Sequence, residues 1–218
     1  MNLVKWVLLI GLVMPLLVSA QQSDLGNWVL LFGNKKINDK FNWHHEVQYR
    51  NYNFVGDLEQ LLLRTGIGVN VTDNTNLLLG YGFIRSENYA GSNEKLIVNE
   101  HRIFQQIITK QNVAKLRLQH RYRFEQRFVE EDFKLRFRYF LGLAYPLWKE
   151  ADSPKELYLS AYNEIFLNTK KDVFDRNRLY GGLGYRLNEM FRLELGYMNQ
   201  FLNLGNRDQL NVVCFVSW

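Results

Sequence analysis

Residues 115–128 read KLRLQHRYRFEQRF, and this stretch alternates between apolar or aromatic side chains and charged ones. The charged set contains Lys115, Arg117, Arg121, Arg123, Glu125 and Arg127. A period of two is that of a β-strand, because successive side chains leave opposite faces of the backbone. The stretch therefore predicts a strand with one apolar face and one charged face.

The same alternation recurs along most of the chain. It is clear in residues 41–51, 60–71, 76–85, 133–145, 176–187 and 190–201, and less regular in 95–109 and 156–167. Short polar turns separate several of these segments, at 72–75, 110–112 and 188–189. No helical period and no interdomain linker is visible, so the sequence predicts one all-β unit.

The overall composition fits this prediction. The chain has 218 residues, 47% hydrophobic and 22% charged, enough for one domain or one closed barrel. Aromatic residues reach 15% and prolines number only 3, a bias that β-sheets tolerate well. The single cysteine, Cys214, excludes an internal disulfide.

The first 20 residues, MNLVKWVLLIGLVMPLLVSA, have the features of a secretory signal. Lys5 precedes a short apolar run, and Val18-Ser19-Ala20 offers a small-residue cleavage site. A retained anchor helix is the weaker alternative, since Pro15 interrupts the run. We therefore expect residues 1–20 to be a signal peptide and 21–218 an exported domain. Export argues against a nucleic-acid partner, although the net charge is +5.

Strand length and aromatic placement favour an outer-membrane barrel over a soluble sandwich. Several segments reach the roughly 9–11 residues with which a tilted strand crosses a bilayer. Aromatic residues lie near strand ends on the apolar face, as in membrane-interface girdles: Trp43, Phe128, Phe133, Tyr145, Tyr185, Phe191 and Trp218. With Trp218 at the periplasmic rim, all three short turns fall on that side. We expect an antiparallel up-and-down transmembrane barrel of 10–12 strands. We count eleven segments and favour twelve strands, because bacterial single-chain barrels have even numbers.

The polar face would then line the lumen. Hairpins centred on the predicted turns place Glu100 beside Arg123, Arg123 beside Arg138, and Glu164 beside both Arg138 and Arg178. They also place Arg136 beside Glu125. The predicted lumen charge belt comprises Glu100, Arg102, Arg121, Arg123, Glu125, Arg136, Arg138, Glu164 and Arg178.

Two interpretations of this belt remain open. It is either a salt-bridge plug in a small closed barrel or a basic constriction selective for anions. Glycines on the same face, Gly66, Gly68, Gly80, Gly82, Gly182 and Gly184, would make room for a solute or for neighbouring side chains.

Catalytic patterns are weak. His44 and His45 are adjacent, so in a regular strand they point to opposite faces and cannot share a metal. We expect His101 and His120 outside the lumen, and nothing places a histidine near Ser160. We therefore expect no catalytic residues, no metal and no cofactor, with a membrane-embedded enzyme as the alternative.

Several stretches carry a resemblance to a known family. They run from DLGNW (24–28), through KKINDKFNWHHEVQYR (35–50) and NEHRIFQQ (99–106), to HRYRFEQRF (120–128). The chain resembles domain of unknown function family 2490, small exported proteins of Gram-negative bacteria. The resemblance implies an outer-membrane β-barrel and carries no activity or ligand. Porins for acidic oligosaccharides are similar only in general design.

Together these observations predict a monomeric barrel in the outer membrane, with lipid and a small anionic solute as its partners. The predicted function is that of a narrow anion channel or a closed structural barrel. A soluble periplasmic β-protein that binds acidic ligands is a further alternative.

Overall fold

The structure is a computed structural model that describes residues 25–54, 56–91, 94–170 and 172–218. The predicted signal peptide, residues 1–20, lies outside the described residues. Within them, no helix has the length and hydropathy that membrane-spanning helices require.

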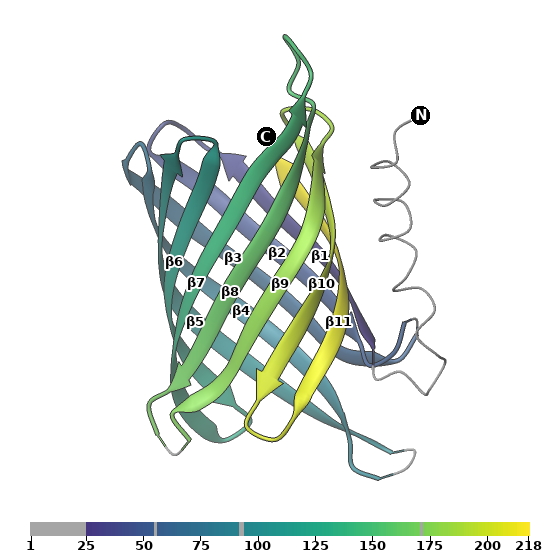
Figure 1. The fold of residues 1–218 in the computed structure, drawn as a ribbon. Helices are drawn as coiled ribbons and strands as arrows, with labels where there is room; N and C mark the ends of the chain where they lie inside the picture. The colour runs from purple at the N-terminus through teal and green to yellow at the C-terminus, as the bar shows by residue number, and fades with distance from the viewer. Residues whose placement is uncertain (1–24, 55, 92–93, 171) are drawn as a thin grey trace, which may run out of the picture.

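The described residues form one closed β-barrel, which confirms the all-β prediction (Figure 1). Each strand pairs with its neighbours in the sequence, and the first pairs with the last. The strands are β1 (Gly26–Lys36), β2 (Phe41–Asn51), β3 (Leu58–Thr72), β4 (Thr75–Tyr89), β5 (Lys95–Val113), β6 (Leu116–Val129), β7 (Asp132–Lys149), β8 (Glu156–Asn168), β9 (Phe174–Arg186), β10 (Phe191–Leu202) and β11 (Asn206–Ser217).

The strand number and the closure differ from the prediction. The described chain has 11 strands, not the twelve that we favoured, and β1 pairs with β11 in parallel rather than antiparallel. The two differences have one cause. An up-and-down path through an odd number of strands leaves the first and last strands pointing the same way. The parallel register runs from Gly26 opposite Gln209 to Asn34 opposite Ser217. The backbone of Trp218 extends this seam, because its carbonyl accepts from Lys36 N at 2.7 Å.

The two ends of the barrel are named here by the residues that lie there. β11 stops at the Trp218 end, and β1 starts at the Gly26 end, which is lower in Figure 1. The connections 73–74, 114–115 and 187–190 lie at the Trp218 end, so the predicted short turns do share one end with the C-terminus. The hairpin between β7 and β8 projects from that same end in Figure 1.

One predicted turn was misplaced. Residues 110–112 belong to β5, and the turn follows at Ala114, whose φ of 52° lies in the left-handed region. Moving the centre of a hairpin by about three residues changes every cross-strand pair by about six. Accordingly, Arg123 pairs with Gln106, and the predicted pairing of Glu100 with Arg123 is wrong.

The barrel inverts the usual distribution of side chains. Alternate positions of the strands point inward and are buried, and many of them are charged, such as Glu46 at 2% and Arg64 at 6% exposure. The intervening positions point outward and carry large apolar side chains, such as Ile67 at 49% and Leu183 at 47% exposure. The alternation seen in residues 115–128 thus becomes an inner polar face and an outer apolar face.

Candidate functional site in the barrel lumen

The predicted belt residues all lie on the inner face. Eight of them are buried to 6% exposure or less, and the Arg121 side chain is 16% exposed. The structure pairs Arg123 with Arg138, Glu125 with Arg136, and Glu164 with Arg178, as the predicted register required. It brings these side chains together as three carboxylate-centred clusters of ion pairs.

Glu125 is the centre of the first cluster and is fully buried. Its carboxylate accepts hydrogen bonds from Arg136 Nη2 and Arg138 Nη1, each at 2.7 Å. Arg123 and Arg102 approach the same carboxylate at 3.8 and 4.0 Å. Four guanidinium groups therefore surround a single negative charge.

Glu164 is the centre of the second cluster. Its Oε1 accepts from Arg138 Nη2 and from Arg121 Nη2, each at 2.7 Å. Arg178 lies farther away, at 3.9 Å from Oε2. Arg138 consequently bridges Glu125 and Glu164, which links the first two clusters across β6, β7 and β8.

Glu100 forms the third cluster with two bidentate arginines. Arg102 donates to both carboxylate oxygens at 2.5 and 2.8 Å, and Arg127 does so at 2.5 and 2.9 Å. Bidentate pairing fixes the planes of both guanidinium groups as well as their positions. Glu100 therefore holds Arg102 and Arg127 in place on neighbouring strands.

The belt also contains residues that the sequence analysis did not select. The side chains of Glu46 and Arg64 pair at 2.5 Å, and Asp175 pairs with Arg136 at 2.9 Å and Arg176 at 3.3 Å. The alternation in residues 41–51, 60–71 and 176–187 already placed most of these side chains inside. Their proximity to the belt could not be inferred, because it depends on how far the strands are offset around the closed barrel.

A basic cavity of about 70 Å³ lies among these clusters. Its lining consists of Arg50, Arg64, Arg102, Arg127, Arg136, Arg138, Arg176 and Arg178, with Gln60, Leu62 and Phe166. Among the described residues that line it, none is acidic. Gln60, Arg127 and Arg176 each lie two residues from the ends of their strands at the Gly26 end, so the cavity belongs to that half of the barrel.

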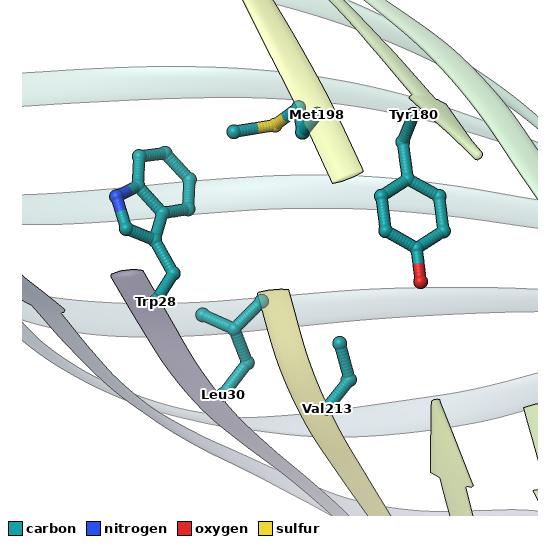
Figure 2. Packing of buried hydrophobic residues seen from close by; sticks show 5 residues of the cluster. All are labelled: Trp28, Leu30, Tyr180, Met198 and Val213. Atoms are coloured by element: carbon teal, nitrogen blue, oxygen red, sulfur yellow. The ribbon is translucent and has the colours of Figure 1, made fainter. Parts of the chain in front are cut away.

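An apolar cluster covers the opposite wall of the lumen, on β1, β9, β10 and β11. Figure 2 shows its buried members gathered inside the barrel: Trp28, Leu30, Tyr180, Met198 and Val213. The guanidinium groups of Arg50 and Arg178 lie 3.8 and 4.8 Å from the centre of the Trp28 ring. Trp28 thus joins the apolar cluster to the basic cavity through cation–π contacts.

Lumen glycines make room for aromatic side chains. A Cβ at Gly80 would lie 2.3 Å from the Phe104 ring, and one at Gly184 would lie 2.1 Å from the Tyr158 ring. Phe104 and Tyr158 are themselves buried. Of the two roles considered for these glycines, the structure shows this packing role at both positions.

The structure separates Ser160 from His101 and His120. Ser160 donates to Glu194 at 3.2 Å, while His101 and His120 lie on the outer face against the hydroxyls of Tyr81 and Tyr139. Within the described residues, no three His, Cys, Asp or Glu side chains are grouped so as to hold a metal ion.

The Gly26 end carries a smaller polar cluster in the connection between β2 and β3. The Asp57 carboxylate lies 2.5 Å from Lys95 Nζ and accepts from the Tyr89 hydroxyl at 2.8 Å. Burial opposes ionisation, but the hydrogen bonds from Lys95 and Tyr89 hold the pKa of Asp57 below its usual value. These contacts tie the connection to the β4–β5 hairpin.

Comparison with known proteins places the chain in a family. The model of the family described as "Protein of unknown function (DUF2490)" matches residues 25–211, which run from the start of β1 to the middle of β11. An uncharacterised protein of Methylorubrum extorquens is 32% identical over 163 residues, covering 71% of this chain and 69% of that protein. The chain therefore belongs to the DUF2490 family, as its sequence resemblance predicted.

Proposed function

We propose that this protein is an outer-membrane β-barrel whose lumen is closed by its own side chains. The observation that carries the proposal is the inverted distribution of side chains, with buried ion pairs inside and exposed apolar residues outside. On the outer face, Leu63, Ile103, Leu179 and Val212 are 42–53% exposed. In water such a surface would be strongly unfavourable, whereas lipid solvates it well.

Aromatic residues on the outer face support membrane insertion. Trp43 and Tyr185 lie toward the Trp218 end, whereas Phe128 and Phe133 lie toward the Gly26 end. All four are 38–47% exposed. Two such groups fit the girdles that membrane barrels place at both interfaces.

Outward polar side chains also fit a lipid environment, because several are hydrogen bonded to one another. The amides of Gln105 and Gln126 pair at 3.1 Å, and those of Asn163 and Asn177 pair at 2.8 Å. A polar group in hydrocarbon is costly unless it is hydrogen bonded within the protein. Cross-strand pairing satisfies part of this requirement on the barrel surface.

The filled interior supports a closed lumen. Side chains from opposite parts of the wall are almost fully buried inside the barrel, including Glu46, Phe104, Glu125, Phe166 and Met198 at 0–2% exposure. Small barrels commonly fill their interiors in this way. The excess of arginines in the belt favours a second candidate, a narrow anion channel that opens when these side chains move.

Tryptophan quenching by brominated lipids tests membrane insertion. The experiment uses two single-tryptophan variants, in which phenylalanine replaces every other tryptophan. One variant retains Trp43, which is 42% exposed, and the other retains Trp28, which is 2% exposed. After folding into vesicles, brominated acyl chains should quench Trp43 and leave Trp28 nearly unchanged. Quenching of Trp43 by aqueous acrylamide but not by brominated lipid would favour the soluble alternative.

A further inference from the structure

We propose that the basic cavity at the Gly26 end is a binding site for a phosphate-bearing anion. The anion is either free in solution or carried on a lipid head group. This proposal depends on the cavity alone and not on the membrane location or conductance of the barrel.

The cavity is lined by more positive charge than negative charge. Eight arginines line the cavity, and among the described residues seven of them form ion pairs with five carboxylates: Glu46, Glu100, Glu125, Glu164 and Asp175. Two of these carboxylates, Glu125 and Glu164, also serve Arg123 and Arg121 outside the lining. Because none of the described residues that line the cavity is acidic, its open space faces an excess of positive charge, which favours an anion.

Two of the lining arginines, Arg50 and Arg178, have the least compensated charge. In the described part of the chain, no carboxylate lies within ion-pair distance of Arg50, which donates instead to Gln48 and to Gln60 Oε1, the latter at 2.7 Å. Among the described side chains, the one carboxylate near Arg178 is that of Glu164 at 3.9 Å, and Arg178 also donates to Gln200 at 3.0 Å. Both groups are buried at 7% exposure or less, so water screens them little.

One of the lining arginines, Arg64, also has an unused hydrogen-bond donor. Arg64 Nε has no hydrogen-bond partner among the described residues, although the Arg64 side chain is only 3% exposed. A buried N–H without a partner is rare in folded proteins and indicates a missing acceptor. Phosphate oxygens are strong acceptors for guanidinium groups.

The size of the cavity agrees with this ligand. A volume of about 70 Å³ accommodates several waters, since a cavity needs roughly 10–15 Å³ to hold one. A tetrahedral anion of five heavy atoms occupies a similar space. A larger head group would place its phosphate in the cavity and the remainder toward the Gly26 end.

The anion is held by positions that are already fixed. Stacking on Trp28 orients Arg50 and Arg178, and Glu100 orients Arg102 and Arg127 through bidentate pairs. Such a rigid set of donors binds with little loss of side-chain entropy.

Titration calorimetry on the full-length mature protein folded in zwitterionic detergent tests the proposal. Inorganic phosphate is titrated into wild type, the double variant R50Q/R178Q and the control R192Q, with chloride at equal ionic strength as the reference anion. Arg192 is an inward arginine at the Trp218 end that stacks on Phe215 and does not line the cavity. A second set uses mixed micelles containing phosphatidic acid, compared with phosphatidylcholine.

We expect phosphate affinity to fall about tenfold or more for each arginine removed, and R192Q to bind like wild type. Binding of phosphatidic acid but not of free phosphate, with loss in the double variant, supports the site and assigns the lipid as its source. If the double variant fails to fold, R176Q replaces it, because Arg176 lines the cavity but is more exposed. We expect R176Q to bind phosphate about tenfold or more weakly than wild type. A phosphate affinity equal to that of wild type counts against the site. No binding of either ligand by wild type, or equal loss in R192Q, overturns the proposal.

Discussion

The substitution Glu125→Gln tests whether the lumen network depends on its few carboxylates. Glu125 has no exposed surface, and it receives Arg136 and Arg138 at 2.7 Å with Arg123 and Arg102 at 3.8 and 4.0 Å. The neutral amide keeps the size of the side chain but leaves four buried guanidinium groups around an uncharged centre. Removing one partner of a buried ion pair typically costs about 3–5 kcal/mol, and the clustered arginines place this variant at the upper end.

The measurement is urea unfolding of the protein in detergent micelles, followed by tryptophan fluorescence and by electrophoretic migration with and without heating. The matched control is Asp132→Asn. In the wild-type protein the Asp132 side chain is 74% exposed, and its carboxylate pairs with Lys134 at 3.3 Å. An exposed pair of this kind contributes about 0–1 kcal/mol. If Glu125→Gln and Asp132→Asn lower the free energy of unfolding equally, the ion pairs around Glu125 do not stabilise the barrel.

Three further predictions concern other parts of the barrel. Gly80→Val should destabilise the barrel by about 1–3 kcal/mol in urea unfolding, because the new side chain would overlap the Phe104 ring. Gly181→Val is the control and should be tolerated, because no other atom lies within 4 Å of a Cβ at that position. Equal losses of stability in the two variants would contradict this prediction. Deletion of Trp218 should speed amide exchange along the parallel β1–β11 seam and leave exchange in the β5–β6 hairpin unchanged. If exchange in the seam does not rise above that in the hairpin, the terminal residue does not close the seam. Because the pKa of Asp57 is lowered in the folded state, its stabilising effect should be complete above about pH 4 and disappear as the pH falls through the folded pKa. Amide exchange of the β2–β3 connection should therefore rise in acid for wild type but not for Asp57→Asn. An equal pH profile in the two proteins would refute this prediction.

The sequence alone predicted which side of most strands faces inward, because alternation is a local property. It was sufficient to pair Glu125 with Arg136 and Arg123 with Arg138, whose strands are joined by the short turn at residues 130–131. It failed between β5 and β6, because the polar residues 110–112 indicate a turn, whereas they continue β5 and the turn follows at Ala114 and Lys115.

The closure of the barrel was not predictable from local patterns. The parallel seam between β1 and β11 depends on the total number of strands, and the even-number rule led to the wrong expectation. The basic cavity depends on the same closure, because Arg50 on β2 and Arg178 on β9 meet only across Trp28 on β1. Their alternation marked them as inward, but only the offset of the strands brings them together.

Conductance in a planar lipid bilayer tests the central claim most directly, namely a lipid-facing barrel whose lumen is filled by ion pairs and aromatic side chains. Insertion is first verified by brominated-lipid quenching of Trp43. If the lumen is filled in this way, inserted wild-type protein should pass no measurable current under a salt gradient. Steady anion-selective steps that diminish in the double substitution Arg123→Gln and Arg138→Gln would contradict it and establish an open channel through the charge belt.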